Sequence, residues 1–455
     1  MKSIIEKHLN ASLTRYVDTG KTSIVMKIVN IVPGFGGTFY CGNCLRDSGF
    51  VASLRQAGHD AVILPVYLPL AMDGNSILTD IPVFYGAVNI YLKQQFPFMR
   101  SMPHWMEHFF NSQTLLKLAA KKSGSTRARG LEELTESMLM GKEGFQRSEL
   151  QALVDFLKHH EKPDIVHFSN ALLLGMAGQI REEAGIPVVC SLQDEDMWVD
   201  AMDRERRADI WQLMAEKGKH VDAFVAVSDY FAAFIKEKMM IPSGKLHVIP
   251  IGVKPEAYTC SGPAMSPRAI GYLSRICPEN GFGILVDAYI RLKSDKQFND
   301  LQLHITGGMT GDDKSFFRDQ MNKLKAKNIL GDVHVFHDFS AGKLSEFFRL
   351  LTVLTVPVLK GEAFGLYQIE AMASGVPIVQ PALGAFPEII DATGGGVIYE
   401  PNTPVALAGK LAEVLSNEKM LLQMSATGRK SIEEKFNCTK ITGKMVELYN
   451  QVCMK

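Results

Sequence analysis

Short apolar runs rich in β-branched residues recur along the chain, and each run ends in small or polar residues. Continuously apolar runs of this kind predict strands of a parallel sheet, because such strands are buried on both faces. The runs predict strands at Lys27–Val32, Asp60–Leu64, Asp164–Phe168, Pro187–Ser191, Ala223–Val227, Leu246–Ile249, Ala269–Leu273, Leu301–Thr306, Val333–Phe336, Val353–Val356 and Pro377–Val379.

Between these runs, apolar residues recur at helical spacing, as at Leu150, Leu153, Val154 and Leu157. Alternating strands and helices predict an α/β protein in which helices cover both faces of parallel sheets. The strands exceed one ordinary doubly wound sheet, and the Pro-, Gly- and Ser-rich stretch Thr259–Pro267 separates the first six from the last five. The sequence therefore predicts two Rossmann-like doubly wound domains that face each other across a cleft.

The pattern divides the chain into an extension at 1–25, an N-terminal domain at 26–262, a C-terminal domain at 263–433 and a final segment at 434–455. Residues 1–21 are polar and lack the apolar core of a signal peptide, so 1–25 is either a loosely held extension or precedes a true start at Met26. Residues 69–146 break the strand–helix alternation and predict a helical insertion with aromatic and basic residues. Its lysines are either solvated or part of an acceptor or membrane-surface platform.

Composition narrows the possible partners. Forty-nine basic residues balance forty-nine acidic ones, so no global field attracts nucleic acid. No apolar stretch approaches the roughly twenty residues that a bilayer requires. Seven scattered cysteines are typical of reduced thiols in the cytoplasm. We therefore expect a cytoplasmic protein without nucleic-acid partners, with peripheral membrane contact through the insertion as the one membrane-associated alternative.

A glycine loop, Pro33–Thr38, follows the first predicted strand and allows the backbone to approach a ligand at Gly36 and Gly37. It lacks the GxGxxG spacing of a dinucleotide site, which argues against a nicotinamide dehydrogenase. The adjoining Cys41 and Cys44 form a CxxC motif that could carry redox chemistry or half a zinc site, or could simply be two small thiols. No second CxxC or histidine pair completes a metal set.

The segment 361–377 predicts a loop, a helix ended by Gly375, and a buried strand. Gly365 and Leu366 begin this helix, where free N–H groups and the helix dipole favour an oxygen ligand. Glu362 precedes the helix, and the side chain of Glu370 leans back toward its start. Two carboxylates beside one helix N-terminus suit a nucleotide sugar, which offers phosphates and hydroxyls together.

This Glu-x7-Glu stretch, GEAFGLYQIEAMASGVPIV, and the following Gly-Ala-Phe-Pro-Glu at 384–388 closely resemble retaining glycosyltransferases of family four. That family has the GT-B fold, and the likeness extends over most of the chain from Met26. The resemblance implies that Glu370 holds the donor ribose and that Glu362 holds the transferred sugar together with the backbone at Phe364, Gly365 and Leu366.

The same resemblance implies that Arg275 neutralises the diphosphate, that Gly36 and Gly37 lie near phosphate and acceptor, and that the final stretch is a helix crossing back onto the first domain. Two positions depart from the family pattern. Asn280, which the resemblance places among the donor-binding residues, replaces a lysine that usually accompanies the arginine, and Ser169 replaces the second histidine of a His-x-His.

His167, the first histidine of that motif, is either a catalytic residue or a satisfied core histidine. Despite these departures, the predicted function is transfer of a sugar from a nucleoside-diphosphate donor to a hydroxyl of a glycan or lipid-linked acceptor. We expect the anomeric configuration to be retained and no metal or other cofactor to be required. The acidic triplet at 194–196 is interpreted as a loop after a strand. The alternatives are a catalytically impaired relative, a sugar phosphorylase, and a thiol-redox protein acting through Cys41 and Cys44.

Overall fold

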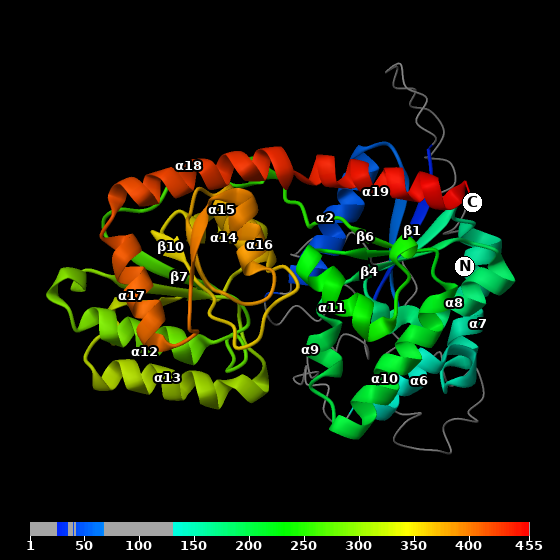
Figure 1. The fold of residues 1–455 in the computed structure, drawn as a ribbon, viewed down its shortest axis with the longest axis horizontal. Coiled ribbons are helices and arrows are strands. Elements are labelled where there is room, and N and C mark those ends of the chain that lie inside the picture. Colours follow the sequence, from blue (N-terminus) through cyan, green and yellow to red (C-terminus); the bar gives the residue numbers. More distant parts are fainter. Residues whose placement is uncertain (1–24, 35–39, 41, 68–130, 455) are drawn as a thin grey trace, which may run out of the picture.

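The computed structural model describes residues 25–34, 40, 42–67 and 131–454. Two α/β lobes lie side by side, and α18 (Glu418–Lys435) and α19 (Cys438–Cys453) run along one side of both (Figure 1). The described helices include none that is both long enough and apolar enough to cross a bilayer.

The N-terminal sheet is parallel and has the order β2-β1-β3-β4-β5-β6. The prediction of its six strands is confirmed, and the order places a topological switch point between β1 and β3, beside the start of the glycine loop. The strands are β1 (Lys27–Val32), β2 (Asp60–Pro65), β3 (Ile165–Phe168), β4 (Val188–Leu192), β5 (Ala223–Ala226) and β6 (Leu246–Val248).

The C-terminal sheet is also parallel, in the order β12-β11-β10-β7-β8-β9. This is the Rossmann order, with the switch point between β7 and β10. The five predicted strands are present, and β12 is an addition that the sequence analysis missed. The strands are β7 (Ala269–Leu273), β8 (Gln302–Thr306), β9 (Val333–Val335), β10 (Val353–Leu354), β11 (Ile378–Pro381) and β12 (Gly396–Tyr399).

Helices cover both sheets (Figure 1). In the N-terminal domain they are α2 (Gly42–Gln56), α6 (Glu132–Met140), α7 (Arg147–Phe156), α8 (Ala177–Gln179), α9 (Glu195–Val199), α10 (Arg204–Lys217) and α11 (Asp229–Met239). In the C-terminal domain they are α12 (Phe282–Lys293), α13 (Lys314–Ala326), α14 (Ala341–Phe348), α15 (Leu366–Ala373), α16 (Phe386–Thr393) and α17 (Pro404–Leu415). Helix α6, the described part of the predicted insertion, contacts α10.

The last helix, α19, returns to the N-terminal domain, where it packs against α2. Its apolar face, with Leu448, Tyr449 and Val452, joins the core formed by Met26 and Ile28. The chain therefore closes over both domains, as the GT-B resemblance implied.

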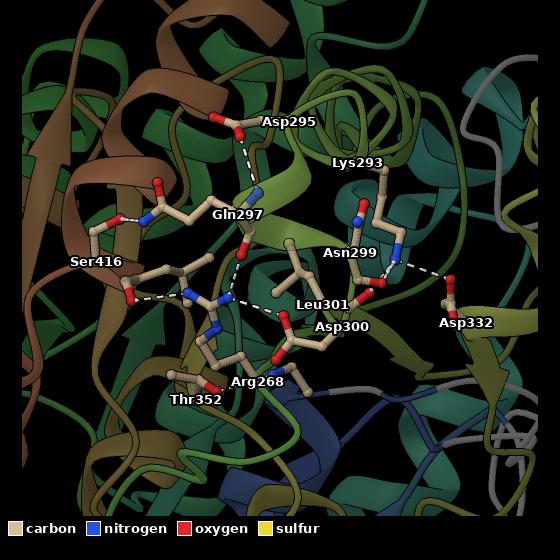
Figure 2. Close-up of polar contacts among 12 residues, drawn as sticks. Arg268, Lys293, Asp295, Gln297, Asn299, Asp300, Leu301, Asp332, Thr352 and Ser416 are labelled. Carbon is tan, nitrogen blue, oxygen red and sulfur yellow. Dashed lines mark hydrogen bonds and ion pairs between the residues drawn. The ribbon is translucent and has the colours of Figure 1, made fainter.

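Polar contacts stabilise the C-terminal domain at the amino ends of its strands (Figure 2). Arg268, just before β7, donates to Asp300 Oδ1 at 2.9 Å, and Lys293 forms an ion pair of 2.9 Å with Asp332 just before β9. Gln297 donates to Ser416 Oγ at 2.7 Å. These contacts lie at the opposite end of the strands from the carboxyl-end loops, where ligands of doubly wound sheets generally bind.

Candidate active site

The carboxyl ends of the strands in the two domains face each other. Helices α2 and α15 meet there by their N-termini, since a Cβ atom on Gly42 would lie 3.4 Å from Leu366 Cβ. The first N–H groups of a helix have no partner within it and carry partial positive charge. Two such ends therefore converge on one place between the domains.

Helix α15 begins after Gly365, whose φ of +81° is in the left-handed region that favours glycine. A side chain at Gly365 would also press on Glu362 Oε2, 3.0 Å from the added Cβ atom. The helix ends before Gly375, whose φ of +77° turns the chain into β11. The two glycines therefore fix the start and end of the helix that carries Glu370, and Glu362 lies against that start, as predicted.

Glu370 is 4% exposed, and both of its carboxylate oxygens accept hydrogen bonds from tyrosines. The Tyr40 hydroxyl donates to Oε2 at 2.5 Å and the Tyr258 hydroxyl to Oε1 at 2.8 Å. Burial raises the pKa of Glu370 to about 7, and the two hydroxyl donors oppose that rise. Tyr40 also donates its backbone N–H to the Gly307 carbonyl at 2.7 Å. A side chain of the N-terminal domain is thus hydrogen-bonded to the carboxylate that is predicted to hold the ribose.

Glu362 faces Asp194, which follows β4 in the N-terminal domain. The Asp194 carboxylate accepts the N–H of Ala363 at 3.3 Å, and its φ of +56° is left-handed. Burial raises the pKa of Glu362 to about 8, and the negative charge of Asp194 adds to the effect. The interpretation of 194–196 as a loop after a strand is wrong for Glu195 and Asp196, which begin α9, and it missed the contact of Asp194 with the loop that carries Glu362. Among the described residues, no group of acids, histidines and cysteines is arranged to hold a metal ion.

Arg275 lies in the loop after β7, at the switch point. Its guanidinium is 3.7 Å from Asp313 Oδ2 and 3.7 Å from Glu279 Oε2. Asn280, predicted to contact the donor, instead directs its amide into its own loop, where Nδ2 donates to Ser274 Oγ at 2.7 Å and to the Arg275 carbonyl at 3.1 Å. Asn280 therefore stabilises the backbone that carries Arg275.

His167 lies on β3, is 1% exposed, and its ring contacts the ring of Tyr449 on α19. Its Nδ1 is hydrogen-bonded to the Tyr449 hydroxyl, and its Nε2 is 2.8 Å from Ser191 Oγ. Burial lowers the pKa of His167 to about 3. Of the two roles that the sequence left open, these contacts favour the satisfied core histidine and give the catalytic role no support.

Several predicted features lie outside the described residues: Gly36, Gly37, Cys41, and the insertion from 69 to 130. The side chain of Cys44 also lies outside them. Tyr40, Asp194 and Tyr258 are the contacting residues that sequence reasoning missed. Of these three, only Asp194 carried a signal, as the first of three acids that closely follow a predicted strand.

Comparisons with known proteins cover both halves of the chain. The family Glycosyl transferases group 1 matches residues 260–431, and Glycosyltransferase Family 4 matches residues 135–257. The MMP alpha-(1->4)-mannosyltransferase of Mycolicibacterium hassiacum is 26% identical over 301 residues, which are 63% of this chain and 70% of that protein.

Two solved structures share the fold. Sucrose-phosphate synthase from Thermosynechococcus elongatus superposes with a TM-score of 0.68 at 16% identity, covering 93% of this chain and 98% of that one. Anabaena HepE, solved in complex with UDP and glucose, gives a TM-score of 0.66 at 13% identity, covering 93% and 99%.

Proposed function

Because the chain belongs to the group 1 glycosyltransferases with the GT-B fold, we propose that it transfers a sugar from a nucleoside-diphosphate donor to a saccharide or lipid-linked acceptor hydroxyl. We propose further that the anomeric configuration is retained. The observation that carries this function is a pair of buried carboxylates on α15 and the loop before it: Glu362 lies against the start of the helix, and Glu370 is on its second turn.

Glu370 supports the assignment of the ribose subsite. Two hydroxyl groups approach its two carboxylate oxygens at 2.5 and 2.8 Å, which is the hydrogen-bonding pattern that a ribose diol would make. Donor binding would then replace at least the Tyr40 hydroxyl with a hydroxyl of the nucleotide. UDP is the first probe to use, since the structurally similar HepE has been solved with it.

The diphosphate would lie where the N-termini of α2 and α15 converge, close to Arg275. Helix N-termini and a guanidinium both stabilise phosphate charge. With Asn280 turned into its loop, this loop supplies one cation beside the leaving group. In the mechanism that we propose, the departing phosphate itself takes the acceptor proton on the same face, so catalysis rests on positioning and on stabilisation of the diphosphate.

Glu362 would bind the transferred sugar. With a pKa of about 8 it keeps its proton near neutral pH, so its carboxyl group can both donate and accept hydrogen bonds to sugar hydroxyls. A residue in this state is unsuited to act as a general base at that pH. Burial is the main cause of this raised pKa, and the negative charge of Asp194, on the other side of the interface, adds to it.

Calorimetric titration with UDP tests the proposal. Glu370→Ala should weaken UDP binding by about 1–3 kcal/mol, because the ribose hydroxyls lose a buried partner. Glu346→Ala, which removes an exposed acid on α14, is the matched control and should bind UDP like the wild type. Equal affinity of Glu370→Ala and wild type would contradict the ribose assignment. A thermal-shift screen of uridine, guanosine and adenosine diphosphate sugars would then identify the donor, and NMR of the product would establish the anomeric configuration.

A catalytically impaired, donor-binding relative is the second candidate, and the turned Asn280 favours it. Incubation of the bound nucleotide sugar with a panel of acceptors separates the two. Binding without product or hydrolysis would support the impaired relative. The thiol-redox alternative depends on Cys41 and Cys44, and a thiol titration before and after oxidised glutathione would detect it.

A further inference from the structure

Helix α11 in the N-terminal domain begins at the interface between the domains, directly after β5. The N–H groups of its first residues require acceptors from outside the helix. Ser228, the N-cap residue, accepts only the third of them, the N–H of Phe231, at 3.1 Å. The first two, of Asp229 and Tyr230, are accepted by the two carboxylate oxygens of Glu388, each at 3.0 Å.

Glu388 belongs to the other domain, in the first turn of α16. A carboxylate at a helix N-terminus is favoured both by hydrogen bonding and by the helix dipole. In most helices this acceptor comes from the adjacent sequence. Here 158 or more positions separate donor and acceptor, so the cap exists only while the domains are in contact.

The same turn of α11 contacts the donor-binding loop. The Ser228 hydroxyl donates to the carbonyl of Ala363, next to Glu362, at 2.7 Å, and this bond is buried. Glu388 is tied to that loop as well, because the N–H of Ala385 donates to the Glu362 carbonyl at 3.1 Å. A Cβ atom on Gly384 would lie 2.6 Å from the Glu362 nitrogen, so the two backbones are in direct contact.

From these contacts we propose that Glu388 is a positioning residue that clamps the first turn of α11 to the donor-binding loop and thereby holds the two domains together. The clamp keeps Glu362 opposite the N-terminal domain. It acts through α11 and the loop backbone and touches no reacting atom. The inference goes beyond the proposed function, because it requires no particular donor or acceptor.

Hydrogen exchange on the full chain, without any added ligand, tests the clamp. Glu388→Ala should accelerate exchange of the Asp229 and Tyr230 amides at least about tenfold, which corresponds to about 1.4 kcal/mol of lost protection. Glu388→Gln retains one acceptor oxygen and should show a smaller change. Asp391→Asn removes another carboxylate from the same helix, α16, and should leave these amides unchanged.

Two remote amides distinguish a clamp from a local helix cap. The N–H of Ala363 donates to Asp194, and that of Tyr40 donates to the Gly307 carbonyl, so both bonds cross between the domains without involving Glu388. If Glu388 holds the domains together, Glu388→Ala should accelerate exchange at both and enlarge the radius of gyration in small-angle scattering. Acceleration confined to Asp229 and Tyr230, or retained protection there, would overturn the proposal. Loss of protection throughout α16 would also overturn it, because unfolding of that helix would then explain the result.

Discussion

Removal of one hydroxyl, in Tyr40→Phe, should lower the stability of the protein and at the same time tighten its binding of UDP. The Tyr40 hydroxyl donates to a Glu370 oxygen at 2.5 Å in a buried position. A hydrogen bond to a charged group contributes about 1.5–3 kcal/mol, and Tyr40→Phe should reduce the free energy of unfolding by that amount. The pKa of Glu370 should also rise above its value of about 7, since a donor that lowers it is lost.

The affinity changes in the opposite direction because the ribose replaces this hydroxyl in the proposed complex. The wild type must break the Tyr40 bond before UDP binds, whereas the variant has no such bond to break. If half of the lower value, about 1.5 kcal/mol, is recovered as binding free energy, the dissociation constant of UDP falls about threefold. Recovery of the whole of that value lowers it about tenfold. Urea denaturation and calorimetric titration with UDP at pH 8, where Glu370 is largely ionised, measure the two effects.

Tyr399→Phe is the matched control for this experiment. The Tyr399 hydroxyl lies in the C-terminal domain and donates to Asn402 Oδ1 at 2.7 Å, but it does not contact Glu370. Its loss should cost stability and leave UDP affinity unchanged. Weaker or unaltered UDP binding by Tyr40→Phe, alongside reduced stability, would refute the reasoning that Tyr40 and ribose share one acid.

Three further predictions concern turnover and stability. Arg275→Ala should lower turnover about a hundredfold, by analogy with the loss of one oxyanion donor, and initial rates that match the wild type would remove Arg275 from the mechanism. Tyr449→Phe should cost about 1 kcal/mol in urea denaturation and leave kcat unchanged, because its partner His167 lies in the core; a large fall in kcat would instead make His167 catalytic. Between pH 6.5 and 8 the Glu362 carboxyl group keeps its proton in the folded protein, whereas in the unfolded chain it loses the proton near pH 4.5. The free energy of unfolding should therefore fall as pH rises, by up to about 1.4 kcal/mol per pH unit for this group. Glu362→Gln should flatten this dependence in denaturation midpoints, and an equal slope in both proteins would contradict the raised pKa.

Inner strands such as β3, β4, β5 and β7 could be predicted because they are buried along their whole length and therefore appear as unbroken apolar runs. Strand β12 was missed because it follows Gly394 and Gly395 and itself begins with Gly396, a cluster that is typical of a turn. The structure explains that last glycine by packing: a Cβ atom there would lie 2.3 Å from the carbonyl oxygen of Ile378 on β11. This requirement arises from a neighbouring strand, so it leaves no local pattern.

The candidate site likewise has residues that the sequence predicts and residues that only the folded structure brings to it. Glu362, Gly365 and Glu370 could be brought together from the sequence because one helix and its preceding loop fix their spacing. Tyr40 and Asp194 come from distant loops of the other domain, and only the docking of the domains brings them to these acids. Sequence position alone does not determine such contacts.

Asn280 shows the limit of reasoning from a substituted motif. The sequence indicates a missing cation at a position expected to face the diphosphate. The structure shows an amide that hydrogen-bonds Ser274 and the Arg275 carbonyl within its own loop. A residue type therefore predicts what charge is absent, but not whether the remaining side chain still points toward the ligand.

The contacts between the domains differ in whether a donor would break them. Tyr40 holds Glu370, so a nucleotide that binds this acid through its ribose must release the Tyr40 hydroxyl. Glu388 and Ser228 hold α11 through a carboxylate and a backbone carbonyl outside the proposed ribose subsite, so their bonds can persist with the donor bound. Donor entry would thus require the release of the Tyr40 hydroxyl rather than the separation of the domains. Because Glu388→Ala should also loosen the interface that carries the Tyr40 contact, the double variant Tyr40→Phe with Glu388→Ala should lose less stability than the sum of the two single variants.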